Sequence, residues 1–179
     1  MEKIKHKNWT HKNGYLPVSW KPEDYLTVPY TRRDHDHGQT NLGFSTAKAN
    51  YDLYKENVSV HVPVDGYELP KLFWDICDNF DLKEMVVSLS MYTPGMLLPW
   101  HTDDFPTYAR NKKVQDKEKI VRIIVFLHDQ KPGHQLWIED KCYFGDSGFY
   151  VAWTGTTKHM AANIGEEDRY VLQITGINE

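Results

Sequence analysis

The second half of the chain alternates short apolar runs with polar, turn-rich joints. Five runs rich in β-branched and aromatic residues stand out, at positions 85–92, 120–127, 134–139, 149–153 and 170–175. Runs of this length and composition predict strands. Many strands in succession predict a mainly β fold, and we expect a double-stranded β-helix of the jelly-roll or cupin-like type with one or more flanking helices.

One segment of the first half has helical periodicity. Residues 67–80 place apolar side chains on one helical face, at Leu69, Leu72, Phe73, Ile76 and Cys77. This spacing predicts an amphipathic helix that packs on the outside of the sheet.

The rest of the first half is predicted to be less regular. Residues 15–30 hold short apolar stretches interrupted by prolines, which predicts extended pieces at a sheet edge. Residues 1–12 predict a mobile tail, and the polar residues 31–45 predict a loop. We expect residues 1–179 to form a single domain, in which an N-terminal extension, 1–84, packs on a jelly-roll core, 85–179, that carries the functional site.

Composition narrows the class of protein. A chain of 179 residues with 40% hydrophobic content can bury one sizeable core, and its net charge of -4 gives no whole-chain attraction for nucleic acid. Two distant cysteines do not make a disulfide framework, and no apolar segment approaches the length of a membrane span. We therefore expect a cytoplasmic protein whose partners are small-molecule, amino-acid or peptide substrates, with no nucleic acid and no membrane. The oligomeric state stays open.

A histidine and an aspartate stand two positions apart in the second half. Residues i and i+2 of a strand point to the same face, so His101 and Asp103 can present an imidazole and a carboxylate to one metal ion. A third ligand would complete a facial triad with open positions. His159 is the candidate, because a strand and a tight turn at 154–156 precede it and a returning strand would bring it close. Asp104 is an alternative to Asp103, although its odd offset turns it to the opposite face.

Two arginines enter apolar strand patterns. Arg169 opens the run 169–174, and Arg122 lies within the run 119–127. A guanidinium in such a strand needs an anionic partner, and its planar fork suits a carboxylate. Beside a metal site, the pair would receive the carboxylate ends of a dicarboxylate. The alternatives are a surface ion pair with nearby acidic residues for Arg169 and a solvent-facing charge at a strand edge for Arg122.

These residues resemble the Fe(II)/2-oxoglutarate-dependent oxygenase superfamily over positions 85–177. The opening motif has the form Tyr92-x-Pro94-Gly95-x-x-Leu98-x-x-His101-x-Asp103. The second motif is similar to the aspartyl/asparaginyl β-hydroxylase-like branch, which contains protein and free-amino-acid hydroxylases, and reads His159-x-Ala161-x-Asn163 with Arg169 ten positions after the histidine. Several members of that branch lack the carboxylate ligand that Asp103 would supply.

The resemblance implies both a site and a reaction. Fe(II) would be bound by His101, Asp103 and His159, and 2-oxoglutarate would be held by residues that flank them, namely Arg169, Arg122, Tyr92 and Ser90. No catalytic residue beyond the metal centre is implied. The reaction would consume O2 and 2-oxoglutarate, hydroxylate an unactivated C–H bond of an amino acid, peptide or related small molecule, and release succinate and carbon dioxide. A free amino acid is slightly favoured.

Two other functional classes stay open: a cupin-like isomerase or epimerase, and a non-catalytic β-barrel binding protein. The isomerase or epimerase chemistry would not call for both Asp103 and Arg169. A binding protein would be expected to have lost a ligand, and none is missing here. Two predicted loops are candidates for segments that cover an active site. They are residues 31–45, which contain two histidines, and residues 104–118, which contain several basic residues. Solvated loops explain their composition equally well.

Overall fold

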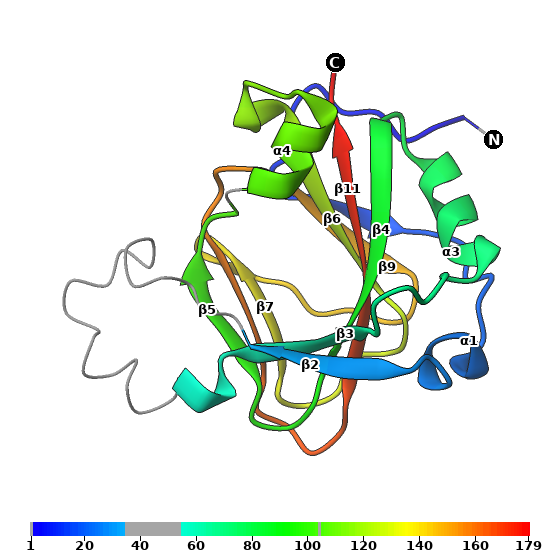
Figure 1. Cartoon of the computed structure of the whole chain (residues 1–179), viewed down its shortest axis with the longest axis vertical. Helices are drawn as coiled ribbons and strands as arrows, with labels where there is room; N and C mark the ends of the chain where they lie inside the picture. The colour runs from blue at the N-terminus through cyan, green and yellow to red at the C-terminus, as the bar shows by residue number, and fades with distance from the viewer. Residues whose placement is uncertain (1, 35–54, 104) are drawn as a thin grey trace.

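The computed structural model describes residues 2–34, 55–103 and 105–179, and within them the fold is built from two antiparallel sheets (Figure 1). The seven-stranded sheet has the order β1 (Lys12–Tyr15), β9 (Phe149–Thr154), β6 (Ile120–Phe126), β11 (Arg169–Ile177), β4 (Lys83–Tyr92), β3 (Ser59–Pro63) and β2 (Tyr30–Asp34). The four-stranded sheet has the order β5 (Leu97–His101), β10 (His159–Asn163), β7 (His134–Ile138) and β8 (Lys141–Cys142).

The two sheets pack face to face around one apolar cluster. Side chains of β6, β9 and β11 meet those of β5, β7 and β10 in it. The predicted mainly β fold of jelly-roll type is confirmed, and the five predicted strands appear with ends that differ by two residues or fewer. The N-terminal strands β1 and β2 form the two edges of the larger sheet.

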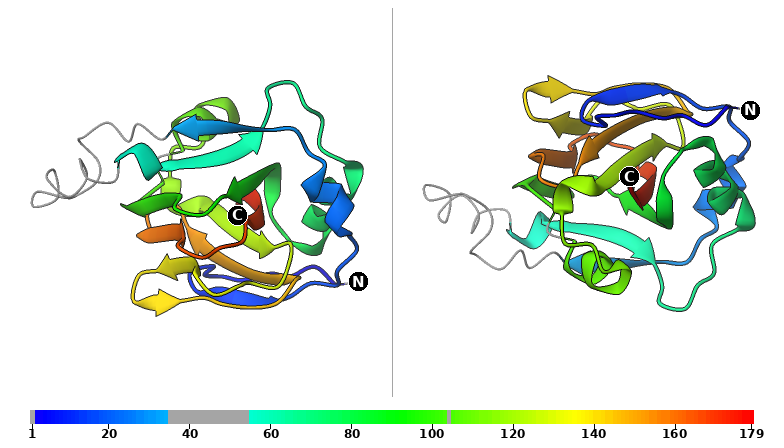
Figure 2. Two further views of the ribbon diagram at one scale, coloured as in Figure 1. Left: turned by 90° about the horizontal axis from the view of Figure 1, so that it is seen from below. Right: turned by 90° about the horizontal axis from the view of Figure 1, so that it is seen from above.

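The central strands β6, β9 and β11 of the larger sheet bury side chains on both faces, and strand alternation decides which residues face inward. On β6, Val121, Ile123 and Val125 pack under the N-terminal elements, whereas Ile124 and Phe126 face the smaller sheet. Figure 2 shows the helices α1 (Pro22–Leu26) and α3 (Lys71–Asp75) on the outer side of this sheet. Even-numbered residues of β6 and odd-numbered residues of β11 therefore line the barrel interior.

The predicted helix 67–80 is shorter in the structure. It begins at Lys71, as α3 (Lys71–Asp75), and continues as the 3-10 helix η2 (Ile76–Asn79). Pro70 stands at the N-cap, and the segment before it is not helical. The predicted packing outside the sheet is confirmed, because Phe73 and Ile76 lie in the outer apolar cluster.

Two predictions about the N-terminal region are wrong. Residues 15–30 are not only extended pieces, because Pro22 opens the helix α1 (Pro22–Leu26) and Asp24 Oδ2 accepts a hydrogen bond of 2.7 Å from Lys21 N. Residues 1–12 are not a mobile tail either. Ile4 exchanges backbone hydrogen bonds with Asn79 and Asp81, and Trp9 is fully buried.

The two predicted loops differ in how much of them is described. Of residues 31–45, those up to Asp34 belong to β2, and the remainder, with His35 and His37, lies outside the described residues. Residues 104–118 are less irregular than predicted, because they contain α4 (Pro106–Lys112) and the start of η3 (Lys117–Lys119). A further 3-10 turn, η1 (Lys55–Asn57), precedes β3. Among the described helices, none has the length and apolar character needed to cross a membrane.

Candidate active site

The two candidate histidine ligands face each other across neighbouring strands. His101 ends β5, His159 begins β10, and the two residues are partners in register, with ring centroids 4.2 Å apart. Each Nδ1 lies close to a backbone carbonyl two residues earlier, at 2.7 Å from Pro99 O and 3.0 Å from Thr157 O. Because a carbonyl oxygen only accepts, Nδ1 carries the hydrogen, and Nε2 carries the lone pair that a metal ion would take.

Asp103 lies between the two imidazoles. Its Oδ1 is 3.7 Å from His101 Nε2, and its Oδ2 is 3.8 Å from His159 Nε2. One ligand atom from each residue lies within 4.8 Å of the others, and this is the one such group of His, Cys, Asp or Glu in the described part of the chain. Two bonds of about 2.0–2.2 Å from one ion can span the 3.7 and 3.8 Å between Asp103 and the two imidazoles. The structure thus brings together the three residues that the sequence singled out.

Charge at this group favours the protonation states that a metal requires. Burial, followed by the neighbouring His159, lowers the pKa of His101 to about 4. Burial would raise the pKa of Asp103, but Arg122 and the two histidines outweigh it and hold this pKa at about 2. At neutral pH the imidazole of His101 is therefore neutral and the carboxylate ionised, and both are ready to coordinate.

Arg122 forms an ion pair with the Asp103 carboxylate. Its Nε and Nη2 lie 3.2 and 3.1 Å from Asp103 Oδ2, while Nη1 donates to Thr175 Oγ1 at 2.6 Å and to Gln173 Oε1 at 3.2 Å. The guanidinium also lies over the ring of Phe105, 4.8 Å from its centroid. Arg122 therefore points into the mouth of the barrel rather than to solvent at a strand edge.

Arg169 occupies a different environment inside the barrel. Arg169 is 1% exposed, and its guanidinium lies 5.1 Å from the ring centroid of Tyr92 and 5.8 Å from that of Phe126. Nε and Nη2 have no hydrogen-bond partner among the residues that the structure describes. Burial lowers the pKa of this guanidinium to about 10, partly opposed by Tyr92. Such burial does not fit the alternative of a surface ion pair.

A buried guanidinium without an anion is costly, so this group indicates a ligand. Desolvation disfavours a charge unless a partner of opposite sign and hydrogen bonds compensate for it. Carboxylates suit the planar fork of arginine through paired hydrogen bonds. The environment of Arg169 therefore fits the carboxylate end of a small anion that enters the barrel.

The two further residues predicted to touch a co-substrate are buried in the same interior. Tyr92 is paired in register with Arg169, and Ser90 with Val171, and both are 2% exposed. Ser90 Oγ accepts a hydrogen bond of 2.9 Å from Gln173 Nε2. Gln173 also contacts Arg122, so one chain of hydrogen bonds joins Ser90 to the Asp103 carboxylate. The charges of Asp103, Arg122 and Arg169 all influence the pKa of Tyr92, which burial raises.

Trp153 of β9 was not among the predicted site residues. It is 1% exposed, its ring centroid is 4.6 Å from that of His159, and it is paired in register with Arg122. Its Nε1 is buried and has no hydrogen-bond partner among the described residues. The indole therefore offers a donor beside a candidate metal ligand. Strand alternation with Val151 is the signal that could have placed it inside the barrel.

Comparisons with known proteins identify no family for this chain. No family model matches the chain, and no curated protein matches it. Among solved structures, a prolyl-4-hydroxylase from Pseudomonas putida is 14% identical with a TM-score of 0.49, covering 88% of this chain and 96% of that one.

Other solved structures are similar at lower scores. A predicted oxalate decarboxylase from Thermotoga maritima is 13% identical with a TM-score of 0.43, covering 67% of this chain and 82% of that one. A Cupin_2 domain of an XRE family transcriptional regulator from Enterobacter cloacae is 10% identical with a TM-score of 0.40, covering 54% and 84%. Proteins with this kind of barrel differ in function, so a function for this chain has to be argued from its site.

Proposed function

We propose that this chain is an Fe(II)- and 2-oxoglutarate-dependent dioxygenase that hydroxylates an unactivated C–H bond of an amino acid, peptide or related small molecule. The observation that carries the proposal is a combination within one barrel. His101, Asp103 and His159 form a compact donor set, and Arg169 is a buried guanidinium whose Nε and Nη2 have no partner among the described residues. A metal-binding barrel that did not bind a dicarboxylate would have no need for the buried guanidinium of Arg169.

The donor set fits the metal. Two imidazole nitrogens and one carboxylate oxygen form a facial triad, which leaves coordination positions open and is typical of non-haem Fe(II) oxygenases. Iron, with O2 and the 2-oxo acid, would supply the oxidising chemistry. The overall reaction balances as R–H, 2-oxoglutarate and O2 giving R–OH, succinate and CO2.

The protein's own residues would bind, orient and exclude water. The carbonyls of Pro99 and Thr157 fix the two imidazole rings, and Arg122 keeps Asp103 ionised and oriented. Arg169 would bind the distal carboxylate of 2-oxoglutarate, with the rings of Tyr92 and Phe126 excluding water around the ion pair. Ser90 accepts from Gln173, which leaves its hydroxyl hydrogen for a further acceptor.

The β-hydroxylase-like branch of the superfamily remains our proposal for the chain's relatives. It is supported by the ten-residue step from His159 to Arg169 and by an inward arginine, Arg122, on the strand after the candidate ligands. We also propose a cytoplasmic location, because Cys77 and Cys142 are both free thiols, as in a reducing compartment.

Anaerobic visible spectroscopy tests the proposal. The metal-free protein is titrated with Fe(II) and then with 2-oxoglutarate, and succinate is measured after O2 is admitted. We expect a charge-transfer band that needs both additions, disappears in His101→Ala and persists in a control variant of an exposed residue, Lys141→Ala. Folded protein that gives neither a band nor succinate would exclude the proposed activity and favour an oxygen-independent cupin-like function.

A further inference from the structure

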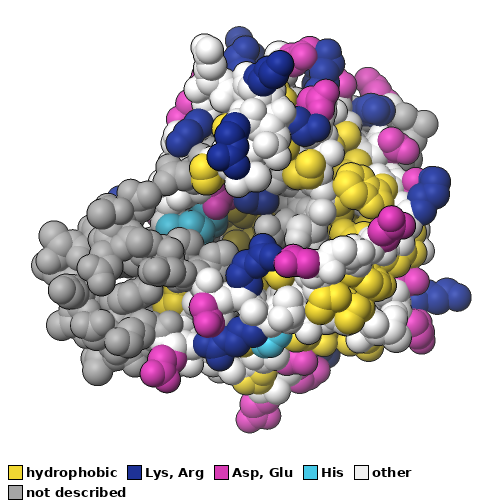
Figure 3. All heavy atoms as spheres, viewed as in Figure 1, with side chains coloured by type: hydrophobic (Ala, Val, Ile, Leu, Met, Phe, Trp, Pro, Cys, Tyr) yellow, Lys and Arg dark blue, Asp and Glu magenta, His cyan; other side chains and the backbone are white. Residues whose placement is uncertain are grey.

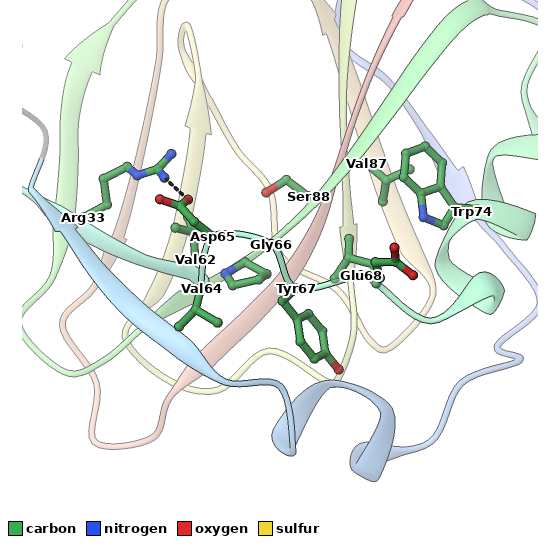
Figure 4. A pocket seen from close by; sticks show the side chains of 12 residues that line it. Arg33, Val62, Val64, Asp65, Gly66, Tyr67, Glu68, Trp74, Val87 and Ser88 are labelled. Atoms are coloured by element: carbon green, nitrogen blue, oxygen red, sulfur yellow. Dashed lines mark hydrogen bonds and ion pairs between the residues drawn. The ribbon is translucent and has the colours of Figure 1, made fainter.

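A surface cleft lies beside strand β4, outside the residues assigned to the metal and the co-substrate. It has a volume of about 580 Å³, and Figure 4 shows it between β4, the segment after β3 and helix α3. Val87 and Ser88 of β4 line it, Trp74 of α3 stands at one side, and Arg33 and Asp65 form an exposed ion pair of 3.5 Å at the other. The proposed function gives this cleft no role.

The cleft lies along a strand edge that no other strand occupies within the described residues. On one side β4 pairs with β11 from Tyr92 to Lys83. On its other side the register contains one pair, Met91 with His61, because β3 diverges from β4 beyond it. Val87 and Ser88 are neighbours in a strand and point to opposite faces, so a cleft that touches both lies at the edge. Backbone groups at such an edge can pair with an added strand.

This edge leads into the candidate active site. Ser88 faces the barrel interior, directly opposite Gln173 in register, so their side chains lie about 5 Å apart. Gln173 Oε1 accepts from Arg122, which in turn holds Asp103. A side chain that enters over Ser88 is thus directed toward the candidate metal ligands. Figure 3 shows that this face is hollowed, with histidine, acidic and basic side chains around the depression.

We propose that the prime substrate is a polypeptide segment that binds in extended form as an additional strand along the free edge of β4. This inference rests on the proposed function and names its substrate class. A free amino acid would be held inside the barrel and would leave the edge unused, whereas a cleft of this size suits a larger ligand. The polypeptide segment therefore replaces the free amino acid that the sequence slightly favoured.

Strand alternation also predicts what the segment contains. If residue i of the segment points inward over Ser88, residues i−1 and i+1 point to the outer face of β4. That face carries Val87 and the partly exposed Trp74, which is 45% exposed. We expect the hydroxylated residue to be flanked by at least one apolar residue, which would pack on the indole.

The test uses full-length Fe(II) protein with two sets of probes. One set is a library of N-acetylated, C-amidated nonapeptides with each amino acid in turn at the centre and apolar or acidic flanks, and the other is the free L-amino acids. Succinate release and the gain of one oxygen atom by mass spectrometry are measured. We expect the best peptide to exceed every free amino acid by at least about tenfold in kcat/KM, equivalent to one 1.4 kcal/mol step.

Variants and modified peptides locate the binding mode. Trp74→Ala should raise KM for the best peptide about fivefold with kcat and 2-oxoglutarate affinity unchanged, as expected for the loss of one aromatic contact. Phe144→Ala removes another exposed aromatic residue, 58% exposed and outside the cleft, and should change nothing. A backbone N-methyl group on the peptide should abolish binding at alternate positions only, because alternate amides face the partner strand.

The outcomes separate this inference from the proposed function. Peptide binding is also followed by fluorescence polarisation on metal-free protein, so the cleft is tested without iron. Peptide binding without an Fe(II)–2-oxoglutarate band would contradict the proposed function alone. Three results obtained with an intact band would overturn the proposal of a polypeptide substrate. They are turnover of free amino acids only, the absence of any hydroxylated peptide, and kinetics of Trp74→Ala that do not differ from wild type.

Discussion

At the mouth of the barrel the carboxylate of Asp103 and the guanidinium of Arg122 neutralise each other. Deeper in the same barrel, the guanidinium of Arg169 lies near the rings of Tyr92 and Phe126, and its Nε and Nη2 have no hydrogen-bond partner among the described residues. The side chains of Asp103 and Arg122 are 18% and 17% exposed, and the Arg169 residue is 1% exposed. The more deeply buried charge is therefore the less compensated one.

Under the proposed function, the difference separates a charge pair that is complete without a ligand from a buried charge that a ligand would compensate. The mouth has its opposite charges in place before any metal binds, so it is an organised donor set. Burial of the Arg169 guanidinium costs desolvation free energy, and under the proposed function a bound anion compensates for this cost. A ligand carboxylate should therefore bind at Arg169 and contribute to stability there. Four variants would break or sharpen this comparison.

The largest effect is expected for Arg169→Met. The affinity of the Fe(II) protein for 2-oxoglutarate should fall about 100-fold or more, since losing one partner of a buried, hydrogen-bonded charge pair costs about 2–5 kcal/mol. The melting temperature of the ligand-free protein should stay the same or rise, because an uncompensated buried charge is removed. Anaerobic calorimetry and thermal melts measure the two quantities.

Arg110→Met is the matched control for that variant, because Arg110 is exposed on α4. It should leave both the affinity and the melting temperature unchanged. A lower melting temperature for Arg169→Met with an unaltered affinity would show that Arg169 has a structural role and would contradict the comparison.

Asp103→Ala should lower the stability of the metal-free protein, in contrast to Arg169→Met. It leaves Arg122 half-buried without its carboxylate, and we expect a loss of about 2–3 kcal/mol in the free energy of unfolding of the metal-free protein. The double variant Asp103→Ala with Arg122→Met should recover most of this loss, because neither charge is then left alone. Urea denaturation measures all four proteins, and simple additivity of the two substitutions would contradict the pairing.

Trp153→Phe tests the unpartnered donor beside His159. The substitution keeps an aromatic ring at the contact and removes the N–H group. We expect about 3–10-fold weaker binding of 2-oxoglutarate, or a shifted charge-transfer band, as for one hydrogen bond with a net contribution of about 0.5–1.5 kcal/mol. A packing role alone would leave the band and the affinity unchanged while lowering the melting temperature.

The smallest effect is expected for Ser90→Ala. The hydroxyl accepts from Gln173, and we predict that it donates to the co-substrate. Its removal should weaken 2-oxoglutarate about threefold, corresponding to a neutral hydrogen bond of about 0.5–1 kcal/mol. Ser147→Ala, which removes a hydroxyl bonded to the backbone oxygen of Leu127, is the control and should not change this affinity.

The sequence predicted the fold and the donor set because both depend on local patterns. Strand alternation predicted that His101 and Asp103 lie close together, and Asp103 Oδ1 is indeed 3.7 Å from His101 Nε2, although β5 ends at His101. The turn after β9 predicted the return of His159. Side-chain chemistry then limited what such a group could bind. The buried position of Arg169 followed from its place at the start of an apolar run.

Contacts between strands that are distant along the chain could not be predicted from the sequence. That Arg122 would pair with Asp103 depends on the register of β6 against β11 and on how the smaller sheet closes over it. The packed N-terminal segment was missed for a similar reason, because Trp9 is buried by tertiary contacts with Phe80 rather than by a local pattern. Likewise, the cleft beside β4 exists only because β3 leaves it after one pair.

The most direct test of the central claim is a comparison of two ligands on two proteins. Binding of 2-oxoglutarate and of 2-oxovalerate, which has a methyl group in place of the distal carboxylate, is measured anaerobically on the Fe(II) forms of wild type and Arg169→Met. The account predicts that wild type prefers 2-oxoglutarate by about 100-fold, as for one buried charge pair, and that the variant loses this preference. Equal binding of the two ligands by wild type, or an unchanged preference in the variant, would contradict the claim that Arg169 binds the distal carboxylate.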